Sequence, residues 1–508
     1  MGIYHSTRSR DFACTSKEAI RRGIAPDGGL FVSDALGDAK LDVNSLAAKS
    51  YPELAREVMG LLLPDYTADE LAACVQEAYD GTFASEEVTP VVSLAAAPGD
   101  AGVPTSVLEL WHGPTSAFKD VALQMLPRLM ARTSAASEDA AAGADRIMIV
   151  TATSGDTGKA ALAGFADAPG CGITVFYPEG KVSRVQNLQM TTQEGSNVSV
   201  CAVRGNFDDA QSAVKRIFAD RELAERLRDG HRTVLSSANS INVGRLVPQV
   251  VYYFAAYAQL LRAGQVEAGD AVEFCVPTGN FGDILAGYYA KRLGLPVAKL
   301  IVASDKNNVL FDFLTTGTYD RNRPFYTTTS PSMDILISSN LERMLYYLSD
   351  GDCGLVSELM AGLSGEGSYS LPESLLARIR EVFGCSWADE DQVAAAIKRC
   401  WDDNGYLIDP HTACGYHALA EVAPTPGAKA RVLLSTASPY KFPKAVAGAL
   451  GLSCPPDDFD CMDVLEKATG TVAPEQLVNL KGKAVRFDDV VDVADMGSYV
   501  EASAGRLA

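Results

Sequence analysis

A lysine within a short segment of small and apolar residues is the first feature with chemical potential. The segment is HGPTSAFKD, residues 112–120, in which Lys119 lies between Phe118 and Asp120. Burial lowers the pKa of a lysine, and the neutral amine forms a Schiff base with an aldehyde. The segment by itself favours a lysine at the surface, and a reactive lysine is the alternative.

Two turns rich in small residues follow expected strands and precede expected helices. They are TSGDTGK at residues 153–159 and PTGNFGD at residues 277–283. Ligands of open α/β sheets bind beyond the carboxyl ends of strands, where the N–H groups of a helix N-terminus attract anions. The first turn is not a P-loop, because its glycines are too close together and no Ser or Thr follows its lysine. Each turn predicts either an anion cradle or a simple helix cap.

The elements around these turns alternate between strands and helices. Apolar runs predict strands at residues 146–151, 173–177, 198–203, 233–236, 271–276, 297–303 and 431–435. Periodic segments predict helices from residue 158 and at residues 208–219, 241–262 and 283–294. Such alternation indicates an α/β protein with largely parallel sheets. Residues 315–404 are expected to form a mostly helical insertion, and the Ala-rich residues 131–144 a surface connection.

Composition limits the partners of this chain. Its 508 residues include 44 Lys and Arg against 64 Asp and Glu, a net charge of −20. A strongly negative protein opposes binding to a polyanion, so nucleic acid is not expected as a main partner. No apolar run approaches the roughly 18 residues that cross a bilayer. The first twelve residues lack the apolar stretch of a secretory signal, which predicts a cytoplasmic location and no membrane association.

Cysteine and histidine spacing gives no metal site. The eleven cysteines are scattered without a Cys-x-x-Cys pair, which predicts buried or free thiols rather than disulfides or zinc ligands. His411 and His417 are six residues apart and do not match the i, i+4 pair of helical zinc sites. Structural roles are expected for both histidines, and no metal is predicted.

Taken together, these segments resemble the threonine synthase family of pyridoxal-phosphate enzymes, within the tryptophan-synthase-β-like group (fold type II). The segments that carry the resemblance, in the family's order, are YHSTRS, APDGGLFV, HGPTSAFKDVALQ, SGDTGKAA, NSINVGRLVPQ, PTGNFGD and LLSTAS. The resemblance is to the family's longer-chain branch. It implies an N-terminal domain at residues 1–98 and two α/β domains, at 99–240 and 241–508, that enclose a pyridoxal-phosphate cleft.

The resemblance also implies roles for individual residues. Lys119 binds the cofactor as a Schiff base and then acts as the catalytic base. The other cofactor contacts are Phe118, Gly279, Asn280, Phe281, Gly282, Asp283 and Thr436. In this scheme the Thr436 hydroxyl meets the pyridine nitrogen, residues 279–283 bind the cofactor phosphate, and the Asp283 carboxylate caps or orients that loop. The expected substrate contacts are Ser154, Asp156 and Thr157 for a carboxylate, and Asn242 and Arg245 for a phosphate.

Arg245 has an open alternative, in which it pairs with an acidic residue instead of binding phosphate. Two further positions depart from the family's usual residues, Ser116 after Thr115 and Ser438 in STASP. They concern the pocket near the cofactor ring and the γ end of the substrate.

The implied reaction converts O-phospho-L-homoserine and water to L-threonine and phosphate. Two alternatives remain. A related phospho-lyase would share every motif and release 2-oxobutyrate. A catalytically silent relative would act as a binding protein, and it is expected to have lost Lys119.

Overall fold

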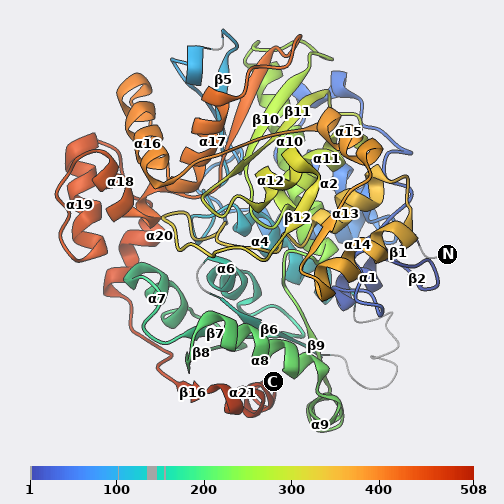
Figure 1. The fold of residues 1–508 in the computed structure, drawn as a ribbon. Helices are drawn as coiled ribbons and strands as arrows, with labels where there is room; N and C mark the ends of the chain where they lie inside the picture. The colour runs from blue at the N-terminus through green and yellow to red at the C-terminus, as the bar shows by residue number, and fades with distance from the viewer. Residues whose placement is uncertain (1–2, 101, 134–145, 154–155, 508) are drawn as a thin grey trace.

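The computed structural model describes residues 3–100, 102–133, 146–153 and 156–507. Its larger sheet has six strands (Figure 1) in the order β14 (Phe383–Trp387), β11 (Val297–Ser304), β10 (Val272–Pro277), β15 (Ala430–Ser435), β5 (Thr105–Glu109) and β4 (Val91–Ser93). All neighbours are parallel except β4, which runs antiparallel to β5. The carboxyl ends of β10, β15 and β5 therefore lie side by side at one edge.

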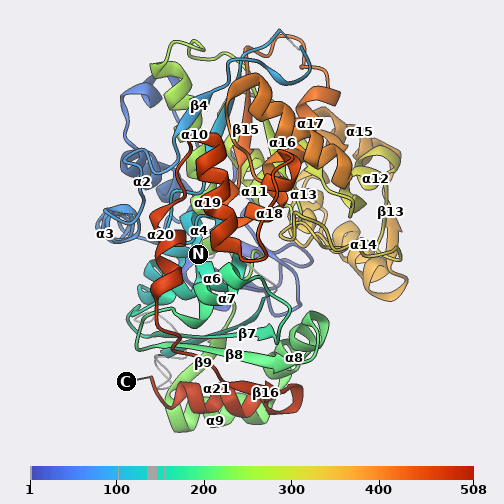
Figure 2. The same ribbon diagram turned by 90° about the vertical axis from the view of Figure 1, so that its left-hand side faces the viewer.

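The second sheet has five parallel strands, in the order β16 (Val490–Asp492), β8 (Val198–Arg204), β7 (Cys171–Pro178), β6 (Arg146–Ala152) and β9 (Thr233–Ser236). Helices α9 (Arg221–His231) and α21 (Met496–Ala504) lie together beneath it, close to the C-terminus (Figure 2). The C-terminal segment thus returns to an element formed much earlier in the chain.

A single long helix, α10 (Val243–Arg262), occupies the centre of the core. Seventeen of its residues are buried, and its apolar side chains lie on all sides of the axis, as expected for a helix enclosed by other elements. It packs against α2 (Tyr51–Leu62), α4 (Lys119–Ala131) and α11 (Gly282–Arg292). The N-terminal layer also contains α1 (Ser16–Arg22), α3 (Ala68–Tyr79), and the antiparallel strands β2 (Ala13–Cys14), β1 (Tyr4–Ser6) and β3 (Phe31–Val32).

The remaining helices pack against the sheets or against one another. They are α6 (Asp156–Phe165), α7 (Arg184–Thr191), α8 (Phe207–Ala219), α12 (Val309–Thr316), α13 (Leu341–Leu348), α14 (Cys353–Gly365), α15 (Glu373–Val382), α16 (Glu390–Asn404), α17 (Pro410–Glu421), α18 (Pro443–Ala449), α19 (Asp458–Thr469) and α20 (Glu475–Val478). Short 3₁₀ helices are η1 (Val43–Ala48), η2 (Pro98–Asp100), η4 (Pro439–Lys441), η5 (Asn479–Gly482) and η6 (Val493–Asp495). Several helices begin with a capping box, for example α7 with Ser183 and Gln186.

The predicted strands are confirmed, but residues 315–404 are not purely helical. This range contains the antiparallel pair β12 (Thr318–Asp320) and β13 (Ser368–Ser370), and β14 joins the edge of the larger sheet beside β11. β14 was missed because it follows α15 directly, without a Gly or Pro break. β5 and β16 pair across the proposed domain boundaries, because β5 joins the larger sheet and β16 the smaller. Most of the Ala-rich connection lies outside the described residues.

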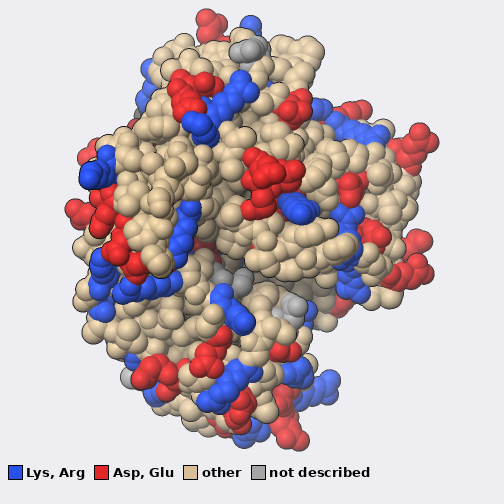
Figure 3. Space-filling view, turned by 60° about the vertical axis from the view of Figure 1, so that its left-hand side comes forward, with Lys and Arg blue, Asp and Glu red and all other residues tan. Residues whose placement is uncertain are grey.

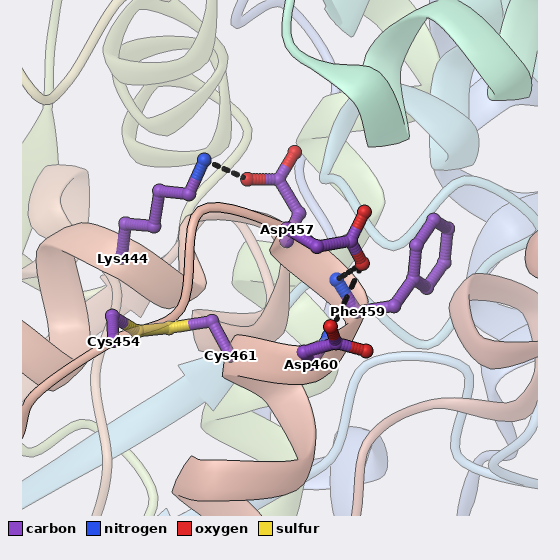
Figure 4. Close-up of a disulfide and its surroundings, with 7 residues drawn as sticks. Lys444, Cys454, Asp457, Phe459, Asp460 and Cys461 are labelled. Atoms are coloured by element: carbon purple, nitrogen blue, oxygen red, sulfur yellow. Dashed lines mark hydrogen bonds and ion pairs between the residues drawn. A yellow bond between two sulfur atoms is a disulfide. The ribbon is translucent and has the colours of Figure 1, made fainter.

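The expectation that the cysteines are all free is corrected by a disulfide between Cys454 and Cys461 (Figure 4). The turn between α18 and α19 brings the Cα atoms of these two cysteines to within 5.2 Å of each other, although they are seven positions apart in the chain. Asp457 caps α19 within the same turn by accepting hydrogen bonds from the N–H groups of Phe459 and Asp460. The other nine cysteines are free, and seven of them are buried.

Charge is not concentrated on the face shown in Figure 3, where acidic and basic side chains are interspersed around a central hollow. Within the described ranges, no helix combines the length and apolar character needed to cross a bilayer. The same ranges contain no group of three or more His, Cys, Asp or Glu side chains placed to hold a metal ion.

Candidate functional site

Lys119 lies at the carboxyl edge of the larger sheet, as the first residue of α4. An isolated bridge between Ala117 and Ala437 joins the lysine segment to the end of β15. Phe118 N–H donates to the Thr436 carbonyl oxygen at 2.8 Å. Thr436 therefore lies beside Phe118 and Lys119, although more than 300 residues separate it from them in the chain. All three are predicted site residues.

The environment of Lys119 favours a neutral amine. The side chain is 9% exposed, and burial lowers its pKa to about 8. Asp156 opposes this shift, whereas Arg245 and Lys441 add to it through their positive charges. A lysine with such a pKa has a substantial neutral fraction near physiological pH, which a nucleophile or a proton acceptor needs.

The predicted phosphate loop connects β10 to α11. Phe281, at the N-cap, has a φ of 61°, and its ring packs against Phe383 with centroids 5.3 Å apart. Among the described residues, no acceptor pairs with the backbone N–H groups of Gly279, Asn280 or Phe281. Open N–H groups at the start of a helix form a favourable anion site.

A segment that sequence reasoning had assigned to the insertion supports this loop. Ser338 Oγ donates to the Gly279 carbonyl oxygen at 2.6 Å, and the Asn340 N–H donates to the Asn280 carbonyl oxygen at 3.0 Å. A Cβ added at Gly279 would lie 3.1 Å from Met333 Cα, so this glycine permits the close approach. The SPSMDI run at residues 330–335 was the available signal, since its small residues and proline fit a tightly packed loop.

The Asp283 side chain does not cap or orient the loop as predicted. Its Oδ1 accepts hydrogen bonds from the hydroxyls of Tyr252 (2.5 Å) and Tyr253 (3.0 Å), both on α10. Burial raises the pKa of this carboxyl to about 7. The carboxyl is thus turned toward α10, and its protonated form would not repel a phosphate at the loop.

This arrangement predicts a pH effect on the stability of the apoprotein. Because the pKa of Asp283 is about 7 in the folded chain and about 3.8 when unfolded, folding binds a proton between these values. The free energy of unfolding should fall by up to about 4 kcal/mol as pH rises from 4 to 7. Asp283→Asn removes this part of the slope, which urea unfolding of both proteins at several pH values measures. Equal slopes would contradict the assignment.

Asp156 was expected to contact the substrate carboxylate, and the structure gives it another role. Its carboxylate is buried and pairs with Lys159 at 2.6 Å and Lys441 at 2.9 Å. These lysines hold the pKa of Asp156 well below its usual value. A carboxylate would repel a substrate carboxylate, so Asp156 is better placed as a counterion. Thr157 is half-buried in the same turn, and Ser154 lies outside the described residues.

Removing this counterion should destabilise the fold. Asp156→Asn leaves two buried lysines without their carboxylate, and breaking a buried ion pair in this way costs about 3–5 kcal/mol. Chemical denaturation of the apoprotein measures the loss. Asp350→Asn is the matched control, because its pair with Arg378 is exposed and should contribute little. A loss no larger than that of the control would refute the counterion role.

Asn242 is not available for a phosphate. As the N-cap of α10, its Oδ1 accepts from the Gly244 N–H at 2.8 Å. Its amide nitrogen donates to the Ile20 and Ser237 carbonyl oxygens at 2.9 and 3.2 Å. Helix capping thus occupies the oxygen of the side chain, and two backbone carbonyls occupy its amide nitrogen.

Arg245, one helical turn after Asn242, keeps a hydrogen-bond donor free. It is 3% exposed, and Nη1 donates to the Ala238 carbonyl oxygen at 2.9 Å. Its Nε has no hydrogen-bond partner and the guanidinium pairs with no carboxylate among the described residues, which contradicts the ion-pair alternative. Burial lowers its pKa to about 10. A buried guanidinium with an open donor, near enough to Lys119 to affect its pKa, is suited to an anionic ligand.

Ser332 and His411 also enter the site. Lys119 Nζ donates to Ser332 Oγ at 3.0 Å, and the Ser332 N–H donates to His411 Nε2 at 3.1 Å. The other ring nitrogen of His411 bonds to Asp409 at 2.6 Å. His411 thus supports a site loop, in line with the structural role predicted for it, and His417 is half-buried on α17.

The two departures from the family pattern lie against each other. The Ser438 N–H donates to the Ser116 carbonyl oxygen at 3.1 Å, and both residues are fully buried. Ser116 has a φ of 57°, and its hydroxyl accepts from Gln476 of α20 at 3.0 Å. These contacts fasten the segment before Lys119 to the C-terminal region.

The residues fit a phosphorylated aldehyde cofactor. Three features lie just after strands of the larger sheet. A lysine of lowered pKa follows β5, open N–H groups at a helix start follow β10, and the Thr436 hydroxyl follows β15. An amine of this kind can bind a carbonyl carbon, open N–H groups can bind a phosphate, and a hydroxyl can meet a ring nitrogen. This is the chemistry that pyridoxal phosphate requires.

Comparison with known proteins gives three family matches. A pyridoxal-phosphate-dependent enzyme family matches residues 82–436, a threonine synthase N-terminus family residues 3–79, and a threonine synthase C-terminal family residues 412–500. Human threonine synthase-like 1 is 40% identical over 78% of this chain, which spans 53% of that relative's length. The chain thus covers about half of this relative.

Full-length relatives are also similar. The threonine synthase of Eremothecium gossypii is 36% identical over 98% of this chain and 97% of its own. A crystal structure of threonine synthase from Brucella melitensis, bound to pyridoxal phosphate, is 38% identical, has a TM-score of 0.85, and covers 99% of this chain and 100% of its own.

Proposed function

The chain belongs to the threonine synthase family, a pyridoxal-phosphate-dependent fold type II family, and from this premise we propose that it makes L-threonine and phosphate from O-phospho-L-homoserine and water. The observation that carries the proposal is a shortage of negative charge around Lys119. Burial lowers the pKa values of Lys119, Lys159 and Arg245, and the positive charge of Lys441 lowers those of the first two further.

Anionic ligands would relieve this shortage. Asp156 pairs with Lys159 and Lys441, while burial raises the pKa of nearby Asp120. Buried charge is costly unless it is paired, so the pocket favours ligands that bring several negative groups. A phosphorylated cofactor and a substrate with both a carboxylate and a phosphate provide them. An unphosphorylated amino acid would leave Arg245 without an anionic partner.

In the proposed reaction, Lys119 transfers the protons. Pyridoxal phosphate, when bound, supplies a conjugated ring that accepts electrons from the substrate Cα. The neutral Lys119 amine accepts the Cα proton and passes it to an oxygen of the substrate phosphate. The amine is then free to accept the Cβ proton as hydrogen phosphate leaves Cγ. Lys119 returns this proton to Cγ, accepts a proton from the water that adds at Cβ, and delivers it to Cα, which gives L-threonine.

The other residues orient and bind. We propose that the N–H groups of residues 279–283 hold the cofactor phosphate and that the Thr436 hydroxyl meets the pyridine nitrogen. Thr157, with Ser154, is proposed for the substrate carboxylate. Arg245 is proposed to bind the phosphate that leaves, since a guanidinium matches phosphate with two parallel hydrogen bonds.

The same proposal includes three further points. The cofactor is attached to Lys119, the chain is divided into domains at residues 98 and 240, and the protein is cytoplasmic. The lowered pKa of Lys119 supports the first. The two separate sheets support a division into two α/β units, with β5 and β16 each joining the sheet of the other unit. Nine free thiols among eleven cysteines support a reducing compartment, although the disulfide argues the other way.

An endpoint assay tests the activity. The purified protein is incubated with pyridoxal phosphate and O-phospho-L-homoserine, and phosphate, threonine and 2-oxobutyrate are quantified together. Threonine equal to phosphate is expected. Phosphate matched by 2-oxobutyrate would identify a phospho-lyase instead. A protein that shows no visible absorbance of bound cofactor and releases no phosphate would be a silent relative.

A further inference from the structure

The Ser332 hydroxyl bridges the reactive lysine and the buried carboxylate of the site. It accepts a hydrogen bond from Lys119 Nζ at 3.0 Å and donates one to Asp156 Oδ2 at 3.1 Å. Ser332 belongs to neither helix that carries these residues, because it lies in the loop between β12 and α13. The bridge therefore depends on how this loop is held.

Two buried residues hold the loop in place. The Ser332 N–H donates to His411 Nε2 at 3.1 Å, so Nε2 must carry a lone pair. The proton of the neutral ring is then on Nδ1, which lies 2.6 Å from Asp409 Oδ2. Asp409 is the N-cap of α17, and both side chains are at most 3% exposed. Ser332 is thus anchored to the end of a helix.

We propose that Ser332 is a positioning residue that receives the Lys119 amine whenever the lysine is not bonded to the cofactor. The proposal deepens the proposed function and rests on it, because substrate must displace Lys119 before the lysine can transfer protons. A freed ammonium would otherwise face the positive charges of Arg245 and Lys441. The hydroxyl links it to Asp156, whose other oxygen already pairs with two lysines. Lys119 stays at a fixed point between its proton transfers.

The charged groups that affect Lys119 come from several elements and are retained in the test variants. They are Asp120 on α4, Asp156 on α6, Arg245 on α10 and Lys441 on η4. A change in the protonation of Lys119 on removal of the Ser332 hydroxyl therefore reports on the bridge itself.

The experiment follows cofactor attachment to the apoprotein. Pyridoxal phosphate is added at a series of pH values, and the rate at which the visible absorbance of the lysine-bound cofactor appears is measured. The rate rises as Lys119 loses its proton. In Ser332→Ala the ammonium lacks its acceptor, so the midpoint should move to lower pH by roughly one unit. His411→Gln, which disturbs Ser332 only through its N–H, should move it the same way by less.

Two variants make the result specific. Ser332→Thr keeps the hydroxyl and should restore the wild-type midpoint. Ser330→Ala is the matched control. Ser330 lies in the same loop as Ser332, but its hydroxyl donates to Asp305 and does not contact Lys119. Thermal unfolding of each variant verifies that it is folded.

The outcomes separate this role from the proposed function. A wild-type protein that attaches the cofactor, with a Ser332→Ala midpoint equal to that of Ser330→Ala, would refute the role of Ser332 alone. Failure of Ser332→Thr to restore the midpoint in a folded protein would refute it too. If the wild-type protein attaches no cofactor, the proposed function fails and the role of Ser332 fails with it.

Discussion

Lys119→Ala is expected to abolish the visible absorbance of the bound cofactor and to lower kcat by at least about 10³-fold. The reason is that, in the proposed reaction, one amine carries both cofactor attachment and the proton transfers, and burial lowers its pKa to about 8. The measurement combines an absorbance spectrum with the endpoint assay of phosphate and threonine.

Lys119→Arg is the matched variant, because it keeps a positive charge opposite Asp156 but has no amine of accessible pKa. It should be as inactive as Lys119→Ala while retaining more stability, since Asp156 loses less of its surrounding positive charge. Turnover within tenfold of the wild type in either variant would exclude Lys119 as the essential base and would require another proton carrier.

Arg245→Gln is expected to lower kcat/KM for O-phospho-L-homoserine by about 10²–10³-fold. Removing one partner of a buried charge pair costs about 2–5 kcal/mol, and each 1.4 kcal/mol is a factor of ten. Most of the loss should appear in KM, and inhibition by free phosphate should weaken in parallel. Steady-state kinetics and phosphate inhibition measure both effects, and Arg245→Lys should be intermediate because it keeps charge without two parallel donors.

Stability distinguishes phosphate binding from a structural role of Arg245. This guanidinium pairs with no described carboxylate and leaves Nε without an acceptor, so its removal costs only the hydrogen bond to the Ala238 carbonyl and should change the Tm of the apoprotein little. L-homoserine provides the ligand control, because it lacks the phosphate and its binding should change little. A variant with a lowered Tm and an unchanged KM for the phosphorylated substrate would assign Arg245 to the fold.

The extent to which the site follows from sequence differs between its residues. The lysine segment was identified because Lys119 lies among small and apolar residues, and the turn at residues 277–283 because it follows a predicted strand. Only the structure shows that both lie at one carboxyl edge, because β5 and β10 belong to the same sheet. Asp156 and Asn242 were placed in the site, but their partners were not anticipated. A carboxylate takes its role from the charges that surround it, and here these are Lys159 and Lys441.

The sequence by itself determined the α/β class, the positions of seven strands of the six- and five-stranded sheets, and the position of the candidate reactive lysine. These properties are local, because hydrophobic period and turn residues act over fewer than about twenty positions. Only the tertiary structure decided that Asp283 faces Tyr252 and Tyr253, that Cys454 pairs with Cys461, and that Ser332 meets Lys119. The last contact joins residues 213 positions apart, and it depends on how a loop, a helix cap and a sheet edge pack together.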